Sequence, residues 1–349
     1  APREIVCDGV CSGPLDQHVE LVLVDRASEG RRFGPRDGVG LARKVGADVA
    51  AALALRGVVS TRWLHYTDAD ARVPPDYFAL PTERALGGCS ALIYPFWHDV
   101  QRGIAEGDAP SRALALYELS LRYYALGLAH AGSPYAFHTV GSTLVVDLYA
   151  YGRVHGMPRL MAGEDFHLLD KLAKVGRVLT MARDPITLLC RPSERVPFGT
   201  GAAMAAIGEG SLDCYSPQVF EVLAAFHAEI HARAADVAIP AAPPPLGDWL
   251  EAGAGPLRAA VADVIARAPD VKRALRQAFV RFDALRTLQL VHRVRDAGCG
   301  ELPWREALER APFVPSPADD TIASWRLALW QAEQKHLHGR YAGVEALGS

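Results

Sequence analysis

Hydrophobic and polar positions change in blocks along the first part of the chain, and these blocks predict alternating strands and helices. Residues 19–25 (VELVLVD) form a β-rich run, which a polar loop follows. From Gly38 to about Leu55 apolar residues recur at helical spacing, and the stretch WLHYTDAD (63–70) indicates the next strand. A strand, a helix and a strand in this order predict a parallel α/β sheet whose strand ends bind ligands.

The same pattern predicts further elements up to about residue 205. Continuous apolar runs favour strands, and apolar residues at helical spacing favour helices. On this basis we expect strands at 88–97, 138–147 and 177–182, and helices at 111–130 and 164–172. The last of these helices has two acidic residues in its first turn.

The pattern changes after about residue 211. The Pro-rich stretch IPAAPPPLGDW (239–249) indicates a linker or an ordered spacer. Helical apolar periodicity with many arginines follows in residues 255–296 and 318–341, without a repeat of fixed period. We therefore predict an α/β domain at residues 1–210 and a mainly helical extension at residues 211–349.

Composition and charge narrow the class of protein. The 349 residues include 37 basic and 40 acidic side chains, a net charge of −3 that provides no field for a nucleic-acid backbone or an anionic membrane. No apolar stretch reaches the roughly 18 to 20 residues of a transmembrane helix, and the first residues do not resemble a signal peptide. Six scattered cysteines are typical of reduced thiols. We expect a cytoplasmic protein without a nucleic-acid partner or a transmembrane segment.

The motif TDAD places two carboxylates, Asp68 and Asp70, at the predicted end of a strand. One carboxylate there can bind a hard cation such as Mg²⁺ or Mn²⁺ together with a substrate's phosphates, and the other can hold a ribose or a water molecule. An equally simple interpretation is that both are solvated turn residues that cap the next segment.

Four short motifs, read in order, resemble glycosyltransferases of the GT-A fold, and most of all the large family 2 of inverting enzymes. They are VELVLVDRASEG, GVGLARKVGADVA, TDAD followed by PPDYF, and GEDFHLLDKL, within residues 19–205. The resemblance implies a Rossmann-like α/β fold with a mixed, mostly parallel sheet flanked by helices. It also implies metal-dependent transfer of a sugar, with inversion, from a nucleoside-diphosphate sugar to an acceptor hydroxyl.

The resemblance also implies roles for individual residues. Asp25 would face the nucleotide base, Gly38, Gly40, Arg43 and Lys44 would lie near the nucleotide, Asp68 and Asp70 would hold the sugar nucleotide and Mn²⁺ or Mg²⁺, and Glu164 and Asp165 would lie near the acceptor. The family pattern implies that Asp165 is the general base, and repulsion within a half-buried acidic pair can raise the pKa of such a base towards neutrality. Without the resemblance, the acidic pair reads as an ordinary helix N-terminus.

Three more residues are candidates because of their neighbours. Arg191 and Arg195 belong to the Gly-rich loop RPSERVPFGTG, which suits a lid that contacts phosphate or an acidic acceptor; they fit equally well as surface arginines. His167, two positions after Asp165, could contact a metal or the acceptor, but a histidine at such a position is more often simply packed or solvated.

The N-terminal region departs from the family pattern. Residues 1–18 contain no Pro-x-x-Asn-Glu-like motif, so the first strand is either missing or supplied in shortened form by residues 4–7, and Arg26 stands where a second acid is usual. Two other functions remain open: a nucleotidyltransferase of similar fold, and a catalytically silent nucleotide-binding or scaffold protein. The helical extension would bind a partner, cover an acceptor site or form a homo-oligomer.

Overall fold

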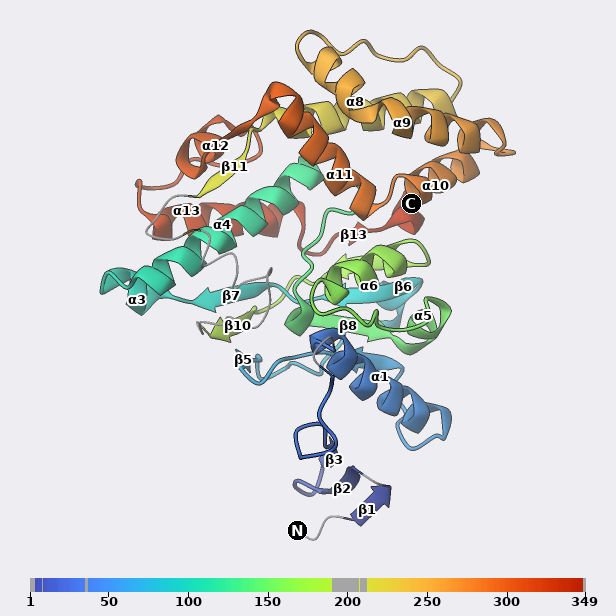
Figure 1. The fold of residues 1–349 in the computed structure, drawn as a ribbon, viewed down its shortest axis with the longest axis vertical. Coiled ribbons are helices and arrows are strands. Elements are labelled where there is room, and N and C mark those ends of the chain that lie inside the picture. Colours follow the sequence, from blue (N-terminus) through green and yellow to red (C-terminus); the bar gives the residue numbers. More distant parts are fainter. Residues whose placement is uncertain (1–3, 8, 35–36, 190–206, 208–211, 348–349) are drawn as a thin grey trace.

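The computed structural model describes residues 4–7, 9–34, 37–189, 207 and 212–347. The chain has a mixed α/β fold, as the sequence predicts. A central sheet lies between helix α1 and a layer of C-terminal helices, and a small sheet at the N-terminal end projects from this body (Figure 1).

The central sheet has five described strands in the order β13-β9-β6-β8-β4. They are β4 (Trp63–His65), β6 (Cys89–Ile93), β8 (Leu144–Asp147), β9 (Arg177–Thr180) and β13 (Tyr341–Ala342). Of these pairings, β6 with β9 is parallel, and the other three are antiparallel. The sheet is therefore mixed, but the prediction that it is mostly parallel was wrong.

A second sheet of three strands continues from the first. Its order is β5-β10-β7, and its strands are β5 (Ala71–Arg72), β7 (Phe96–Asp99) and β10 (Ile186–Leu189). The single strand predicted at residues 88–97 is thus divided between two sheets. Pro95 lies at the division, because proline has no N–H to donate to a ladder.

The N-terminal sheet consists of β1 (Glu4–Cys7), β2 (Val10–Pro14) and β3 (Glu20–Val24), all antiparallel. The parallel unit predicted from residues 19–25 to 63–70 was therefore wrong: β3 pairs with β2, and β4 pairs antiparallel with β8. A short loop between β2 and β3 makes the local antiparallel pairing available. The strand at residues 4–7 likewise belongs to this small sheet and not to the central one.

Helices before residue 190 cover the sheets. They are α1 (Val39–Leu55), α2 (Glu83–Leu86), α3 (Gln101–Ala105), α4 (Ala109–His130), α5 (Leu148–Arg153) and α6 (Glu164–Ala173). Helix α4 starts where the side chain of Asp108 accepts a hydrogen bond of 2.9 Å from the backbone N–H of Ser111. It is buried on most sides, because hydrophobic clusters pack against two of its faces.

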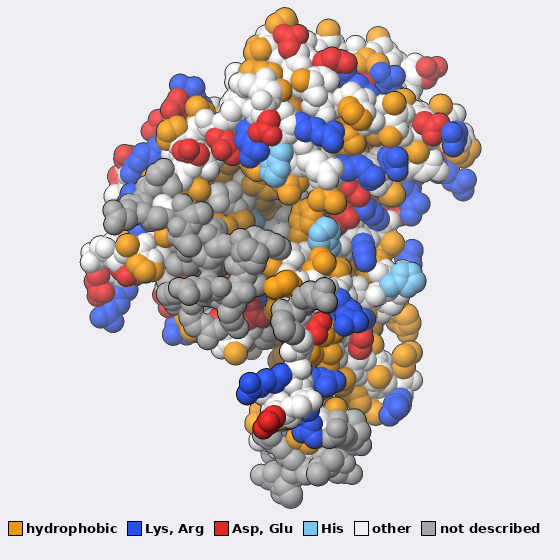
Figure 2. All heavy atoms as spheres, viewed as in Figure 1, with side chains coloured by type: hydrophobic (Ala, Val, Ile, Leu, Met, Phe, Trp, Pro, Cys, Tyr) orange, Lys and Arg blue, Asp and Glu red, His pale blue; other side chains and the backbone are white. Residues whose placement is uncertain are grey.

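Residues 212–347 are mainly helical. They form α8 (Gln218–Ala234), α9 (Leu246–Ala266), α10 (Val271–Arg281), α11 (Ala284–Val294), α12 (Trp304–Arg310) and α13 (Ile322–His336), and a short ladder pairs β11 (Asp213–Tyr215) with β12 (Glu301–Pro303). The last helix packs along α4, and β13 completes the central sheet. In Figure 2, acidic and basic side chains are interspersed over this helical layer.

A buried ion network joins α13 to α4. Its charged residues are Glu118 and Arg122 on α4, and Arg326 and Glu333 on α13, and the rings of His98 and His138 also bind the two carboxylates. The Arg326 Nη2 atom lies 3.0 Å from Glu118 Oε2, Arg122 Nε lies 3.1 Å from Glu118 Oε1, and Arg122 also binds Glu333. With two charges of each sign, the network is balanced, as buried charges must be.

Candidate active site

Residues from distant parts of the sequence meet beyond the end of β4. The backbone N–H of Tyr66 donates to the carbonyl of Leu144 at 2.8 Å, which extends the pairing of β4 with β8 and leads the chain to Asp68. The turn Gly141–Thr143 precedes β8, and α6 begins at Glu164. The fold thereby brings the first acid of TDAD and the acids of GED to one place.

Arg43 of α1 connects these acids. Its Nη2 atom donates to both carboxylate oxygens of Asp68, each at 2.9 Å, and its Nη1 atom donates to Glu164. The side chains of Arg43 and Glu164 are 13% and 2% exposed, whereas that of Asp68 is 42% exposed. Burial alone would lower the pKa of Arg43, but the neighbouring carboxylates raise it. We call Arg43, Asp68, Glu164 and Asp165 the acid–arginine cluster.

Asp165 is a member of this cluster whose pKa is raised towards neutrality. Burial, and then the charge of Glu164, raise its pKa to about 6, against smaller lowering effects from the Phe166 and Gly141 amides and from Arg43. The Phe166 N–H donates to Asp165 Oδ1 at 2.8 Å. A carboxylate with a pKa near neutrality can accept a proton from a substrate, which is what a general base requires.

Gly141 leaves the space that Arg43 occupies. A Cβ atom at this position would lie 2.0 Å from Arg43 Nη1 and 2.5 Å from its Cζ. Any side chain there would displace the guanidinium from Asp68 and Glu164. Residue 141 falls within the strand predicted at 138–147, but the sequence does not indicate its contact with Arg43, which lies almost 100 positions away.

The predicted metal site would have few ligands from the protein. Within the residues that the structure describes, no group of three or more His, Cys, Asp or Glu side chains is placed to hold a metal ion. Magnesium sites in phosphate-transferring proteins, however, commonly use one or two carboxylates and substrate phosphates. Asp68 and Asp70 are carboxylates of the kind that such a site uses, and Asp68 already binds Arg43. The Asp70 carbonyl is held by the N–H of Leu189 at 3.0 Å.

The glycines predicted near a nucleotide have a packing role in the structure. A Cβ atom on Gly38 would lie 2.4 Å from the backbone of Met161, and one on Gly40 would lie 2.6 Å from the carbonyl of Leu160. These close approaches fix the start of α1 against the segment that leads into α6, and so they help to place Arg43. Their contact with a nucleotide stays a prediction.

Lys44 does not join the acid–arginine cluster. Its ammonium group lies 2.9 Å from Asp48 Oδ2, one turn further along α1, and Asp48 also accepts a hydrogen bond of 2.9 Å from the hydroxyl of Tyr151. Lys44 thus contributes to the contact between α1 and α5. Its contact with a nucleotide stays a prediction.

Asp25 lies in the N-terminal sheet region and not with the acids of the central sheet. Its Oδ1 atom accepts hydrogen bonds of 3.0 Å from the backbone N–H groups of Ala27 and Ser28, and Arg31 pairs with its Oδ2 atom at 3.2 Å. Hydrogen bonds from Ser28 and Ala27 hold its pKa well below the usual range. The structure therefore gives Asp25 a turn-forming role, and its contact with a nucleotide base stays a prediction.

Three predicted site residues remain, namely two arginines and a histidine. Arg191 and Arg195 lie outside the described residues. The ring of His167 packs edge-on against Phe166, with 5.4 Å between centroids. His167 thus has the packed position that is common for histidines at helix starts.

Two residues beside TDAD were not singled out as site residues by the sequence. The hydroxyl of Tyr66 and the Nδ1 atom of His65 are buried and have no hydrogen-bond partner among the described residues. Burial, and then the charge of Arg183, lower the pKa of His65 to about 4, so its ring is neutral at pH 7. Unpartnered buried polar atoms commonly mark a place where a ligand or water binds.

Comparisons with known proteins give no match from which a function for this site could be inferred. No protein-family model matches the chain, and no curated protein or solved structure matches it. Among the described helices, none is both long enough and apolar enough to cross a membrane.

Proposed function

We propose that the protein is a metal-dependent glycosyltransferase that moves a sugar from a nucleoside-diphosphate sugar to an acceptor hydroxyl with inversion. The observation that carries the proposal is Asp165, a half-buried carboxylate with a pKa of about 6 beside the Arg43 contacts to Asp68 and Glu164. A base that is largely ionised at neutral pH and still able to accept a proton suits the activation of a hydroxyl group.

The proposed reaction gives each of these residues a role. Asp165 takes the proton of the acceptor hydroxyl while the acceptor oxygen bonds to the anomeric carbon. The bond between that carbon and the diphosphate oxygen breaks on the opposite face, and the nucleoside diphosphate leaves. Asp70, with Asp68, would hold Mn²⁺ or Mg²⁺, which supplies Lewis-acid neutralisation of the diphosphate charge. Arg43 keeps Asp68 and Glu164 in place, because its guanidinium binds both.

A ligand screen tests whether the protein binds the nucleotide part of a sugar donor. The purified chain is heated with UDP, GDP, TDP or CDP, each with and without Mn²⁺. A ligand that binds only the folded state stabilises it by about 2.7 kcal/mol at a hundredfold excess over its dissociation constant. We expect one nucleotide to raise the melting midpoint in the presence of metal. Asp70→Ala should lose this metal-dependent rise, whereas Asp263→Ala on α9 should keep it.

The alternative functions give different results. Release of pyrophosphate from a nucleoside triphosphate would identify a nucleotidyltransferase. No shift with any nucleotide at any metal concentration would favour a silent protein and overturn the proposal. Release of a nucleoside diphosphate from a sugar nucleotide, dependent on an added acceptor, would support it directly.

A further inference from the structure

A cavity of about 700 Å³ lies between the loop after β9 and helix α13, away from the acid–arginine cluster. This volume is within the range of pockets that bind small molecules. Pro185 lines the cavity at the start of β10, and Leu189 at the other end of that strand binds the carbonyl of Asp70. A four-residue strand spans about 13 Å, so the cavity is separate from TDAD.

Two tryptophans form one side of the cavity. Trp97 comes from β7 and Trp330 from α13, and their ring centroids are 5.8 Å apart at an interplanar angle of 84°. Because the rings stand edge to face, they do not form two parallel walls that would sandwich a flat base. Trp330 also packs edge to face against His338, with 5.0 Å between ring centroids, and it lines the cavity.

The buried ion network supports both rings from behind. The Arg326 guanidinium carbon lies 4.1 Å from the centroid of Trp97, and that of Arg122 lies 5.1 Å from the centroid of Trp330. Both arginines are fully buried, so their positions are fixed by their carboxylate partners. The tryptophans are therefore held in position before any ligand binds, which reduces the entropy that binding must overcome.

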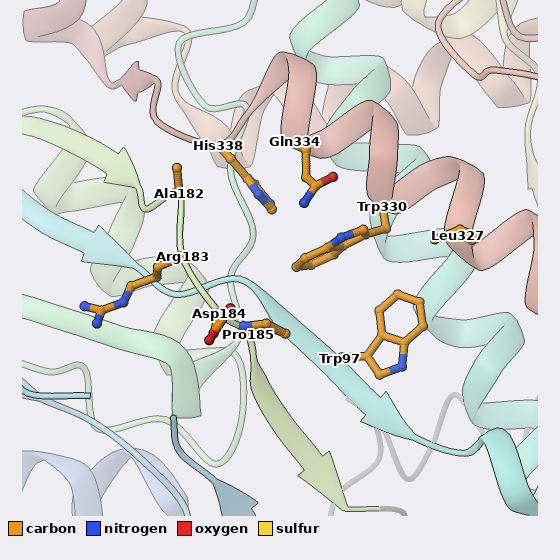
Figure 3. Close-up of a pocket in the computed structure, with 9 residues that line it drawn as sticks. All are labelled: Trp97, Ala182, Arg183, Asp184, Pro185, Leu327, Trp330, Gln334 and His338. Carbon is orange, nitrogen blue, oxygen red and sulfur yellow. The ribbon is translucent and has the colours of Figure 1, made fainter. Parts of the chain in front are cut away.

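Polar side chains face the cavity from two sides. Gln334 and His338 lie on one side of the cavity and Asp184 lies on the other (Figure 3). Burial lowers the pKa of His338 to about 4, so its ring is neutral and offers one donor and one acceptor. The amide of Gln334 offers both kinds of group, and the carboxylate of Asp184 accepts.

None of the described residues that line the cavity directs a fixed positive charge toward the tryptophans. Arg183 is the only one among them with a fixed positive charge, and its guanidinium points away from the tryptophans (Figure 3). It is held there by Asp76 and by the Tyr94 hydroxyl at 3.3 Å. The cavity is thus poorly suited to phosphate or another anion.

We propose that this cavity is a saccharide-binding site in which a sugar ring packs on Trp330 and hydrogen-bonds to Gln334 and Asp184. A sugar ring has C–H groups on its face, which pack on the negative face of an indole, and hydroxyls around its edge, which both donate and accept. The proposal does not depend on sugar transfer at the acid–arginine cluster.

Binding of neutral sugars tests this site. Glucose, galactose, mannose, maltose, cellobiose and trehalose are each added at millimolar concentrations to the full chain, and saturation-transfer NMR and tryptophan fluorescence report binding. We expect at least one of these sugars to bind. Gln334→Ala and Asp184→Ala should each weaken it about tenfold, the equivalent of about 1.4 kcal/mol.

Controls separate this site from others and from misfolding. Gln331→Ala makes the same change on the exposed side of α13, away from the cavity, and should leave the affinity unchanged. Trp330→Phe retains a ring for packing and should bind more weakly than the native chain but more tightly than Trp330→Ala. Binding of none of the six sugars would overturn the proposal. So would binding that persists in Gln334→Ala and Asp184→Ala, or that disappears in Asp165→Asn.

Discussion

The raised pKa of Asp165 has a direct consequence for catalysis. Because only the ionised carboxylate can accept a proton, activity should rise as the pH increases through about 6 and level off above it. Asp165→Asn should lower kcat by roughly 10²- to 10⁴-fold, the usual contribution of a general base. Initial rates of nucleoside diphosphate release between pH 4.5 and 8 would measure both effects. A rate that is flat across this range would contradict the assignment.

The same pKa shift should make the folded state less stable as the pH rises, whereas activity should increase. The folded state binds the Asp165 proton more tightly than the unfolded state does, so this group's contribution to stability is lost as the pH rises from about 4 to about 6. Asp165→Asn removes that contribution. Its denaturation curves should therefore depend less on pH than those of the native chain in this window, which distinguishes a shifted carboxylate from a surface one.

Gly141→Ala tests how Arg43 is positioned. The new Cβ atom would overlap the Arg43 guanidinium and displace it from Asp68 and from the buried Glu164, so the substitution should also lower stability. Once Arg43 moves, its lowering effect on the pKa of Asp165 is lost. We therefore expect the acid limb of the pH–rate profile to move to higher pH and kcat/KM to fall about tenfold, or by about 1.4 kcal/mol.

A second glycine provides the control for this substitution. Gly152 in α5 has no heavy atom within 4 Å of the position of an added Cβ. Gly152→Ala should keep the native pH profile and, as a helical glycine replaced by alanine, should be neutral or slightly stabilising. If Gly141→Ala behaves in the same way, Arg43 does not influence Asp165.

The contact between α4 and α13 depends on charges that water does not reach. Glu118, Arg122 and Arg326 are completely buried, and Glu333 is 1% exposed. Removing one partner of a buried pair leaves the other charge without compensation, and this costs far more than the pair itself contributes. The network also holds Trp97 and Trp330 from behind, so its loss should affect the cavity as well as the fold.

Glu333→Gln measures the strength of this contact. The substitution leaves Arg122 with one carboxylate partner in place of two. We expect the free energy of unfolding to fall by about 3 kcal/mol or more, as urea denaturation would show. Glu309→Gln on α12, where the side chain is exposed, should change it by less than about 0.5 kcal/mol. Similar effects for the two variants would mean that the network does not stabilise the fold.

The sequence predicted helices more accurately than the pairing of strands. The helices expected at residues 38–55 and 111–130 occur as Val39–Leu55 and Ala109–His130, because helical periodicity is a local property of the chain. Residues 19–25 were correctly read as a strand, but their partner was not. A β-rich run predicts a strand but not the partner of that strand. The pairing of strands determines which strand ends lie at the same edge of a sheet.

The contacts in the candidate site were also not predicted, because they join residues that are far apart in the sequence. The acidic motifs were visible as residue types, but Arg43 and Glu164 are 121 positions apart, and nothing local indicates that they bind each other. Trp97 and Trp330 are separated still further. Contacts of this kind depend on how α1, α6 and α13 pack, and this packing cannot be predicted from local patterns in a single sequence.

Hydrophobic clusters extend across the boundary that the sequence predicts near residue 210. One cluster joins Val146 of β8 and Leu168 of α6 to Phe226 of α8 and Phe279 of α10. Another joins Leu119 of α4 to residues of α13. The two predicted parts therefore share their cores, whereas independent domains each have a core of their own.

This shared core predicts that residues 1–210 do not fold when separated from residues 211–349. The fragment would lack β13 from the central sheet and would leave Glu118 and Arg122 without their partners on α13. We expect the full chain to unfold in one transition in calorimetry and in far-UV circular dichroism, and the fragment to show no cooperative transition. As a control, a protease site inserted in the chain between α8 and α9 permits cleavage after folding, and the two pieces should stay associated through the common core. Two separate transitions in the full chain, or a fragment that melts cooperatively by itself, would show instead that the α/β part is an independent domain.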